Sequence, residues 1–419
     1  MIKSATLELS KTRELIIQLN MKKENKKIQK KIKLAHLIAR MGKGGAEENT
    51  RYTLQGLDKN KYDLDLIVGE EFGSRYAKIF QSENIKVIKI PYFKGSLHPL
   101  YDIGLFFKLI SLFSRNKYDM IHTHGTKAGI IGRIAARISG VPIIIHGLHG
   151  NALNAFSAKW LNMLFLYFER LTGTFTDAHI SVSAILSEKY IKKGIGNPEK
   201  YYTVRSGMDL NSFSQDQKVN CAAVKKRWSL SSADFIIGNI SRLESLKGHT
   251  FLLRVMKILK DQVKDRRIVL LIIGDGKEKH KISRMIKGSG LENHVILAGY
   301  CNDIPAILSV MNLLVHTSSR EGLPRVMVQA AAAGLPMVAF NVDGIPEIIR
   351  NGYNGFLIEP KNIEQLAEKI KIYLNKPKLL DIHGKNSRKI VKDRWTVEGM
   401  VKKTQEIYSF LVKEKITRT

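Results

Sequence analysis

Glycines, cations, carboxylates and imidazoles recur in this sequence where short apolar runs end. The first run, Ile32–Ala39, leads into RMGKGGAE, which places Gly42, Gly44 and Gly45 directly before a helical pattern. Glycines at such a place let backbone N–H groups approach an anion at the helix N-terminus. A dinucleotide fingerprint requires G-x-G-x-x-G, and the sixth position counted from Gly42 is Glu47. The dinucleotide interpretation is therefore weak, and a plain tight turn remains an alternative.

A second group of cations follows the apolar run Phe235–Ile240, in the string ISRLESLKGH. Arg242 and Lys247 stand there between the end of a predicted strand and the start of a predicted helix. A guanidinium and an ammonium beside a helix N-terminus suit a pyrophosphate. Two solvated surface cations are the structural alternative.

The third group lies in SSREGLPRVMVQAAAAG. Pro324 suits the first turn of a helix, which predicts that the backbone amides of Gly322 and Leu323 face a ligand. The carboxylate of Glu321 can accept hydrogen bonds from sugar hydroxyls. Gln329, eight residues later, lies near the same face and can hold a ribose, although a solvent-facing glutamine is the alternative.

The elements that position these groups alternate between short apolar runs and helical periods, which is typical of a doubly wound α/β fold with parallel sheets. We expect strands at Ile32–Ala39, Tyr62–Val68, Ile85–Ile90, Met120–His124, Pro142–His146, Ala178–Val182, Tyr201–Arg205, Phe235–Ile240, Ile268–Ile273, Val295–Ala298, Leu313–Thr317, Met337–Phe340 and Gly355–Ile358. We expect helices at Ala46–Leu57, Leu100–Phe113, Lys127–Ile138, Lys159–Leu171, Gly248–Leu259, Pro324–Ala333, Pro346–Arg350, Ile363–Tyr373 and Trp395–Val412.

The polar stretch Asp209–Ser232 divides the chain into two α/β halves of similar size. We expect a basic, disordered extension over residues 1–30, Rossmann-like domains over 31–215 and 216–394, and a C-terminal helix over 395–419 that crosses back to the first domain. Because ligands of open α/β sheets bind beyond the carboxyl ends of the strands, the two domains are expected to face each other across a cleft.

Charge is the unusual property of the composition: 68 Lys and Arg against 38 Asp and Glu give a formal net charge of +30 over 419 residues. Such a field favours polyanions, namely nucleic acid, an anionic membrane surface or phosphorylated small molecules, although surface lysines need no partner. The two cysteines, Cys221 and Cys301, form no CxxC pair, which argues against a zinc knuckle and fits a reducing compartment. The sequence contains no apolar run of 18 residues and no signal-peptide core.

The chain resembles the retaining glycosyltransferases of family 4 in six motifs that occur in the same order. They are GGAE, HTH-x-x-KAG, SRL…LKG, IGDG, EGLP and GIPEII. These enzymes have the GT-B fold of two Rossmann-like domains. The match runs from about Lys31 to about Leu411, and HTHGTKAGIIGRIAARISGVPIIIHGLHG resembles the branch that builds capsule, O-antigen and exopolysaccharide units.

The resemblance implies roles for the residues that match its motifs. Arg242 and Lys247 would hold the donor diphosphate, and Glu321, the first acid of the E-x7-E motif, would hold the hydroxyls of the transferred sugar. Gln329 stands where the family has its second acid, which puts the strength of nucleoside recognition in question. His146, expected at the end of its strand, matches the catalytic histidine near the sugar, with His124 and His149 as further sugar or acceptor contacts.

The family implies transfer with retention of anomeric configuration and without a metal ion or other cofactor. It implies a hexosyl or N-acetylhexosaminyl transferase that uses a nucleotide-sugar, taken here as a UDP-sugar, and a polyprenyl-diphosphate-linked or other glycan acceptor. That places the protein in the cytoplasm, peripherally on the inner face of the membrane. The only D-x-D string, Asp63-Leu64-Asp65, lies inside a predicted strand and is interpreted as structural.

The surface expected to meet anionic lipid lies in the first domain. Five basic residues, Lys108, Arg115, Lys117, Lys127 and Arg133, accompany the apolar faces of two predicted helices, and a third predicted helix gathers Trp160, Leu161, Leu164, Phe165 and Phe168. Basic groups and apolar side chains together favour an anionic membrane interface. Packing of these helix faces on the sheet is the alternative.

Three other classes compete. A nucleic-acid-binding protein would explain the charge, but no helix-turn-helix, RRM or zinc pattern is present, so we expect no nucleic-acid partner. A sugar-nucleotide epimerase or a phosphorylase shares the two-domain fold, although a phosphorylase needs a longer chain and a cofactor lysine. A catalytically silent scaffold gains slight support from Gln329.

Overall fold

The computed structural model describes residues 31–42, 44–96, 98–153, 156–213 and 221–416; the predicted basic extension over residues 1–30 lies outside these ranges. The described chain forms two compact units. Unit 1 takes the residues up to Gly207 together with those from Val397 onward, and unit 2 takes Met208–Thr396. The chain therefore passes between the units at 207/208 and again at 396/397.

Unit 1 is built on a seven-stranded parallel sheet in the order β3-β2-β1-β4-β5-β6-β7. Its strands are β1 Ile32–Ile38, β2 Tyr62–Val68, β3 Lys86–Lys89, β4 Met120–His124, β5 Ile143–Leu148, β6 Ala178–Ser181 and β7 Tyr201–Thr203. Its helices are α2 Gly45–Gly56, α3 Ser74–Ser82, α4 Pro99–Asn116, α5 Thr126–Ile138, α6 Lys159–Thr174, α7 Ala184–Lys192 and α15 Val397–Lys415, with a 3-10 turn at Pro198–Lys200.

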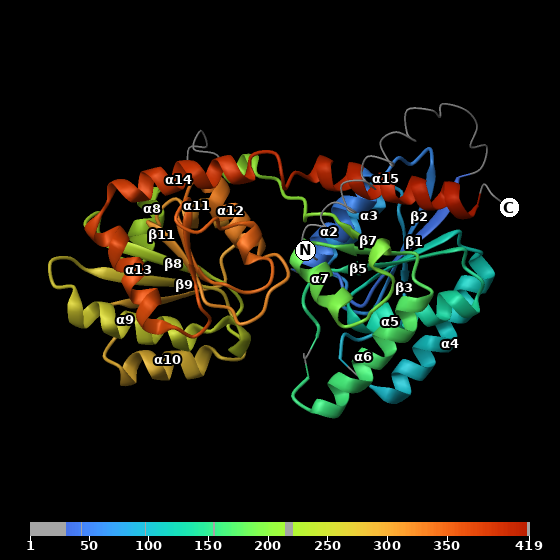
Figure 1. The fold of residues 1–419 in the computed structure, drawn as a ribbon, viewed down its shortest axis with the longest axis horizontal. Helices are drawn as coiled ribbons and strands as arrows, with labels where there is room; N and C mark the ends of the chain where they lie inside the picture. Colours follow the sequence, from blue (N-terminus) through green and yellow to red (C-terminus); the bar gives the residue numbers. More distant parts are fainter. Residues whose placement is uncertain (1–30, 43, 97, 154–155, 214–220, 417–419) are drawn as a thin grey trace. The chain divides into compact units, whose positions relative to one another are not determined.

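The sheet of unit 1 is covered on both faces, which explains why strands such as β5 are apolar along most of their length. One hydrophobic core lies under α2, α3 and α15, and a second lies under α4 and α5. The C-terminal helix returns to unit 1 because Met400, Ile407 and Leu411, the predicted apolar stripe, are buried in the first of these cores. Figure 1 shows α15 beside α2 on that face.

Unit 2 is built on a six-stranded parallel sheet in the order β10-β9-β8-β11-β12-β13. Its strands are β8 Phe235–Ile240, β9 Ile268–Ile273, β10 Val295–Gly299, β11 Leu313–His316, β12 Met337–Phe340 and β13 Gly355–Ile358. Its helices are α8 Cys221–Arg227, α9 His249–Gln262, α10 Lys279–Gly288, α11 Ile304–Leu308, α12 Arg325–Ala333, α13 Ile363–Asn375 and α14 Lys378–Val391, with 3-10 turns at Asn211–Phe213, Ser245–Lys247 and Ile345–Glu347.

Both sheets reverse the direction in which strands are added, between β1 and β4 in unit 1 and between β8 and β11 in unit 2. Such a switch point, at the carboxyl ends of the strands, is where open α/β sheets bind ligands. The predicted two-domain α/β architecture is therefore confirmed. The two switch points are the places where a ligand site is expected.

Two local expectations were wrong. The predicted helix Pro346–Arg350 is only the 3-10 turn Ile345–Glu347, because the backbone N–H of Arg350 donates to the side chain of Asn354 at 2.8 Å instead of continuing a helix. No helix was expected within the polar stretch Asp209–Ser232, yet it contains α8.

Candidate functional site

The switch point of unit 2 gathers several predicted residues. After β8 the chain passes through the 3-10 turn Ser245–Lys247 into α9, and after β11 it runs through Glu321 into α12. Lys247 Nζ lies 2.6 Å from Glu321 Oε1, and His316 Nε2 lies 2.8 Å from the same oxygen. The backbone N–H of Glu321 donates to Asp343 Oδ2 at 2.6 Å, which fixes the main chain behind the carboxylate.

This arrangement holds Glu321 as a carboxylate. Burial alone would raise its pKa, because desolvation penalises the charged form, but the hydrogen bond and charge of His316 and the charge of Lys247 outweigh burial and lower the pKa to about 2. The side chain is only 10% exposed, so solvent screens these interactions weakly. The site therefore presents a buried anionic hydrogen-bond acceptor next to a cation.

Gly248 explains why Lys247 can reach the end of β11. Its φ of 69° lies in the left-handed region, and a Cβ at this position would lie 2.2 Å from the carbonyl oxygen of Thr317. Thr317 in turn donates its hydroxyl toward the carbonyl oxygens of Lys247 and Gly248, at 3.1 Å each. Glycine at 248 thus lets the two loops close on each other and brings the ammonium to the carboxylate.

The other residues predicted for donor binding are less closely grouped. Arg242 is largely exposed and pairs with Glu244 at 2.7 Å. Gly322 and Leu323 are buried immediately before α12, and the carbonyl oxygen of Gly322 accepts from Gly344 N at 3.1 Å. That their backbone amides face a ligand stays a prediction. Gln329 is partly exposed in α12, and no hydrogen bond among the described residues joins it to Glu321.

In unit 1, Gly44 and Gly45 lie at the N-terminus of α2, where the sequence predicts them. The side chain of Glu47 fills the space beside Gly44, since a Cβ there would lie 2.2 Å from Glu47 Oε2. Glu47 and Glu48 both stand in the first turn and already complement the positive end of the helix. This charge reduces the attraction of the turn for a diphosphate, so the role of the two glycines stays a prediction.

The position predicted for His146 was wrong in one respect. Strand β5 ends at Leu148, so His146 lies inside the strand rather than at its end. Its Nδ1 is 2.9 Å from the hydroxyl of Thr123, and the ring packs over Gly129, where a Cβ would lie 2.4 Å from the imidazole. His149, which follows the strand, occupies the carboxyl edge instead.

His124 and His149 lie together at that edge, with His124 Nδ1 2.8 Å from His149 Nε2. Burial lowers the pKa of His149 to about 4 and holds the pKa of His124 and of His146 well below the usual range. All three imidazoles are therefore neutral at pH 7. They can act as hydrogen-bonding groups or metal ligands, and they carry no charge toward a phosphate.

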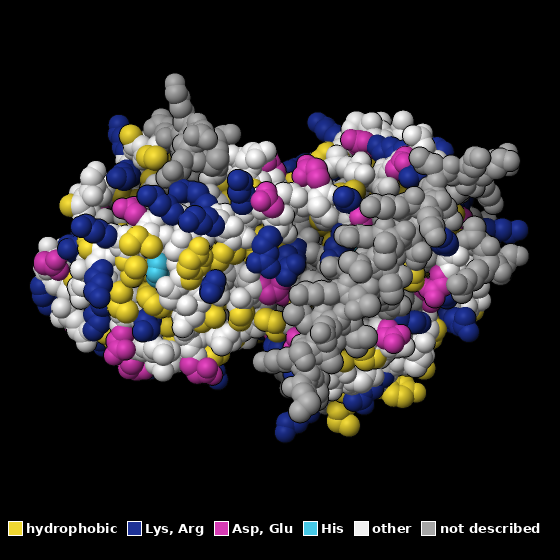
Figure 2. Space-filling view, turned by 45° about the horizontal axis from the view of Figure 1, so that its top comes forward, with side chains coloured by type: hydrophobic (Ala, Val, Ile, Leu, Met, Phe, Trp, Pro, Cys, Tyr) yellow, Lys and Arg dark blue, Asp and Glu magenta, His cyan; other side chains and the backbone are white. Residues whose placement is uncertain are grey.

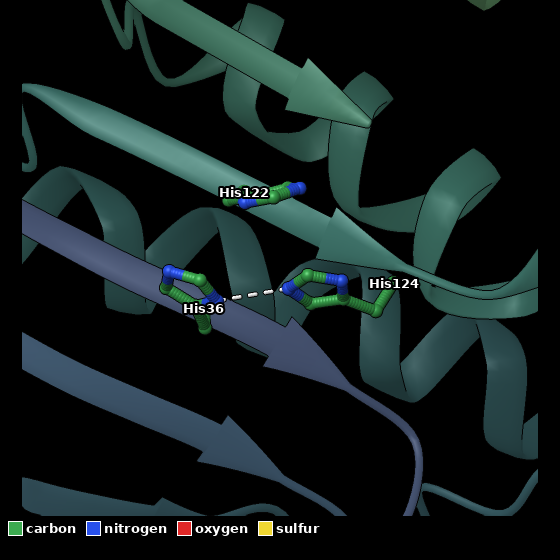
Figure 3. A group of neighbouring side chains, drawn as sticks. All are labelled: His36, His122 and His124. Carbon is green, nitrogen blue, oxygen red and sulfur yellow. Dashed lines mark hydrogen bonds between the residues drawn. The ribbon is translucent and has the colours of Figure 1, made fainter. Parts of the chain in front are cut away.

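The structure also brings together residues that the sequence analysis did not group. One ring nitrogen each from His36, His122 and His124 lies within 4.8 Å of the other two (Figure 3), an arrangement that could hold a metal ion. In unit 2 the sequence analysis missed His316 and Asp343, which support Glu321. His316 could have been found from the sequence, because it is an ionisable residue at the end of an otherwise apolar strand. Asp343 could not, because it reaches Glu321 from 22 residues away and no local sequence pattern links the two.

Two family profiles match the chain. The family described as "Glycosyltransferase Family 4" matches residues 43–212, and the family described as "Glycosyl transferases group 1" matches residues 222–390. The first thus covers most of unit 1 and the second covers most of unit 2.

Known proteins match nearly the whole chain. An Escherichia coli UDP-Gal:alpha-D-GlcNAc-diphosphoundecaprenol alpha-1,3-galactosyltransferase is 26% identical, over 93% of this chain and 100% of its own length. The Staphylococcus aureus capsular polysaccharide biosynthesis glycosyltransferase CapM is 27% identical, over 87% of this chain and 94% of its own. Among solved structures, HepE from Anabaena in complex with UDP has a TM-score of 0.76 at 22% identity, covering 90% of this chain and 100% of that one.

Proposed function

Since this chain belongs to the family 4 glycosyltransferases and has their GT-B fold, we propose that it transfers a hexose or N-acetylhexosamine from a UDP-sugar to a polyprenyl-diphosphate-linked glycan, with retention of configuration and without a metal ion. The observation that carries the proposal is the cluster of Lys247, His316 and Glu321 at the switch point of unit 2. The named activity of the Escherichia coli relative and the UDP bound in HepE support the choice of acceptor and donor.

In this proposal, Lys247 holds the diphosphate of the donor and Arg242 adds a second cation. In the structure each cation is paired with a carboxylate, Lys247 with Glu321 and Arg242 with Glu244. A donor would bring two phosphate groups into competition for the ammonium while its sugar hydroxyls donate to Glu321. The ion pair thus keeps both groups in position before the donor arrives, and the donor exchanges one ionic partner of Lys247 for another.

The charge that develops on the leaving diphosphate needs stabilisation. Lys247 supplies a positive charge, and the backbone N–H groups before α12 and at the start of α9 supply aligned dipoles. These groups can replace a divalent ion as the counter-charge. Glu321 accepts hydrogen bonds from the sugar and stabilises positive charge that develops at the anomeric carbon, which suits a transition state of carbocation character.

We propose His149 rather than His146 as the imidazole that meets the sugar or the acceptor. His149 follows β5 at the carboxyl edge, whereas His146 is buried against α5. Because both rings are neutral, the contribution of His149 is a hydrogen bond and not a charge. A loss of activity in His149→Ala that exceeds the loss in His146→Asn would support this assignment.

The acceptor suggests that the enzyme works at a membrane surface, and unit 1 offers a face for it. Helix α4 exposes Leu100, Ile103 and Phe107, and α6 exposes Trp160 and Met163, the last at 72%. Lys108, Arg115 and Lys117 are exposed on or just after α4. Among the described residues, no helix has the length and apolarity needed to cross a bilayer. We therefore propose peripheral binding through this surface of α4 and α6.

Two of the basic residues expected at this surface are not available to it. Lys127 is buried and pairs with Asp102 at 2.5 Å, and Arg133 is buried and pairs with Glu169 at 2.8 Å. The reason is that α5, which carries both, lies between α4 and α6 and packs on the sheet. The electrostatic part of the membrane proposal rests on the remaining exposed cations, Lys108, Arg115 and Lys117. On the face that Figure 2 displays, basic side chains lie among acidic and apolar ones.

Liposome binding tests this part of the proposal. We expect the full-length protein to bind anionic vesicles in a salt-sensitive way and neutral vesicles little, because each basic group near anionic headgroups contributes ~1 kcal/mol. Phe107→Ser with Trp160→Ser should weaken binding, whereas the exposed apolar residue Ile382 of unit 2 provides a matched control in Ile382→Ser. Equal, negligible cosedimentation with both vesicle types at low salt would favour a soluble acceptor.

A transfer assay tests the function itself. The purified enzyme is incubated with a panel of nucleotide sugars and a polyprenyl-diphosphate-linked saccharide, and the product is analysed by mass spectrometry and by the anomeric coupling in its NMR spectrum. We expect one class of donor to add one sugar to the acceptor with retention of configuration. Glu321→Ala should abolish the product. Glu368→Gln changes an exposed carboxylate in the same unit and should not. Hydrolysis or epimerisation of the donor without an acceptor product would point to the epimerase alternative.

A further inference from the structure

Three imidazoles meet on one face of the sheet in unit 1, beneath α15. His36 of β1 is the register partner of His122 on β4, and His124 follows two residues later, so all three side chains point to the same face. Their ring centroids are 4.2 to 5.0 Å apart. All three residues are at most 4% exposed. Figure 3 shows the rings of His36 and His124 facing each other, with His122 beside them.

Each of the three rings has one nitrogen held by a partner outside the trio. Tyr408 of α15 contacts His122 Nδ1 at 2.5 Å and His36 Nε2 at 3.3 Å, and His149 Nε2 contacts His124 Nδ1 at 2.8 Å. A histidine that binds a metal ion nearly always has its other ring nitrogen fixed in this way, because the second bond sets the tautomer and the orientation of the ring. The cluster therefore has the outer hydrogen bonds of a metal site.

The remaining nitrogens are His36 Nδ1, His124 Nε2 and His122 Nε2. The first two lie 2.8 Å apart, and His122 Nε2 is buried with no hydrogen-bond partner among the described residues. If the outer nitrogens carry the protons, all three remaining nitrogens present lone pairs to one another. A proton can be shared by two of them, but a single cation can satisfy all three. Leaving His122 Nε2 buried without a partner is unfavourable, because its lone pair has lost water and gained no hydrogen bond.

The neighbouring strand leaves room beside the unsatisfied nitrogen. Gly147 of β5 has no side chain, and a Cβ at this position would lie 3.1 Å from His122 Nε2 and 2.7 Å from His124 Nδ1. Any larger residue would crowd these two rings. The small residue thus keeps space open next to His122 Nε2.

We propose that His36, His122 and His124 bind a transition-metal ion, with Zn²⁺ as the ion that best suits three imidazoles. Imidazole nitrogens are ordinary Zn²⁺ ligands at about 2.0–2.1 Å, and sites with three protein ligands take water or hydroxide as the fourth. Tetrahedral ligands at that distance are about 3.4 Å apart. One ring nitrogen from each histidine lies within 4.8 Å of the other two, so the rings must move to surround an ion. Because neutral imidazoles bring no negative charge, a hydroxide is the fitting fourth ligand.

The ion would have a defined effect on His149. With His124 Nε2 bound to metal, His124 Nδ1 carries the ring proton and donates to His149 Nε2. His149 must then carry its own proton on Nδ1, the nitrogen that is buried without a partner among the described residues. The metal ion would thus fix the tautomer of His149, with the proton on a buried ring nitrogen. The donor diphosphate proposed above binds in unit 2, so this site does not conflict with metal-independent transfer and is tested separately from it.

Metal content tests the proposal directly. The full-length protein, carrying no histidine tag, is produced in zinc-supplemented medium and purified without chelators, and the metal is measured by plasma mass spectrometry. We expect about one Zn²⁺ per chain. Protein produced in cobalt medium should show the visible d–d absorption of four-coordinate Co²⁺.

The variants are chosen to remove the ligand nitrogen and keep the outer hydrogen bond. His122→Asn and His124→Asn place an amide near the former Nδ1, and His36→Gln places one near the former Nε2. Each should lose the metal. His383→Asn is the matched control, because His383 is also buried and its Nδ1 contacts the hydroxyl of Tyr373 at 2.7 Å, in unit 2; it should keep the metal.

Refolding of the wild-type protein keeps the test decisive if the variants do not fold. Zn²⁺ added during refolding should be retained after dialysis and should raise the midpoint of thermal unfolding, because an ion that binds only the folded state stabilises it. Wild-type protein that is folded but contains no more metal than the three ligand variants, and that refolds with the same midpoint with or without Zn²⁺, would overturn the proposal. The cluster would then be a hydrogen-bonded network only.

Discussion

The buried carboxylate of Glu321 gives a stability prediction whose size follows from the structure. Its pKa falls from 4.5 to about 2 in the folded protein, a change of about 2.5 units, and each unit corresponds to about 1.4 kcal/mol. The folded state therefore prefers the carboxylate over the neutral acid by about 3 kcal/mol. Glu321→Gln imitates the neutral acid, so we expect it to destabilise unit 2 by about that amount at pH 7.

The pH dependence follows with a definite sign. Because the folded pKa is lowered, this stabilisation is complete above the unfolded pKa of 4.5 and is lost as the pH falls toward about 2. The difference between wild type and Glu321→Gln should therefore be constant from about pH 6 to pH 8 and shrink below about pH 4.5.

Thermal and urea unfolding measure the effect. For a unit of this size, 3 kcal/mol corresponds to a fall of roughly 6–12 °C in the unfolding midpoint. Glu368→Gln, which neutralises an exposed carboxylate in the same unit, controls for the change in net charge and should lie within about 0.5 kcal/mol of wild type. The reasoning is refuted if Glu321→Gln is as stable as Glu368→Gln. In that case Lys247 and His316 would not stabilise the carboxylate form of Glu321.

Three further outcomes follow from the same site. Gln329→Glu should be tolerated or should raise activity, because it restores the acid of the family motif near a ribose; loss of transfer in a folded variant would show that the amide has its own role. Arg242→Ala should weaken donor binding by about 1 kcal/mol, roughly fivefold, since this exposed side chain must leave Glu244, and unchanged affinity would remove Arg242 from the site. Transfer should continue in EDTA, measured as product formed over time, because Lys247 and backbone amides supply the counter-charge; strict dependence on added Mn²⁺ or Mg²⁺ would contradict this.

Much of the fold could be predicted from the sequence because its strands are apolar along their length. Runs such as Ile268–Ile273 are buried on both faces and have few other interpretations. Helix α14, in contrast, was not predicted, because its buried face includes small and polar residues such as Gly384 and Ser387. Gly384 packs directly on the backbone of Gly334, where a Cβ would lie 2.2 Å from the carbonyl oxygen, and such contacts leave no apolar periodicity.

The candidate site could be predicted where its residues follow strand ends and was missed where they come from distant segments. Lys247 and Glu321 are 74 residues apart, yet both were expected, because each stands at the end of a strand next to the switch point. His36 gave no such signal: it lies inside its strand, and only the register with β4 places it beside His122. The burial of Arg133 against Glu169 likewise depends on tertiary packing that helix periodicity does not contain.

Calorimetric titration of UDP-sugars into the wild type and into Lys247→Ala tests most directly whether unit 2 holds the donor. We expect saturable binding by the wild type and an affinity loss of about 1.5–3 kcal/mol in the variant, roughly 10- to 150-fold, because a charge-assisted contact to the diphosphate is removed. Lys376→Ala, a change at an exposed lysine of the same unit, should bind like the wild type. Equal dissociation constants for Lys247→Ala and the wild type would contradict the proposed donor site.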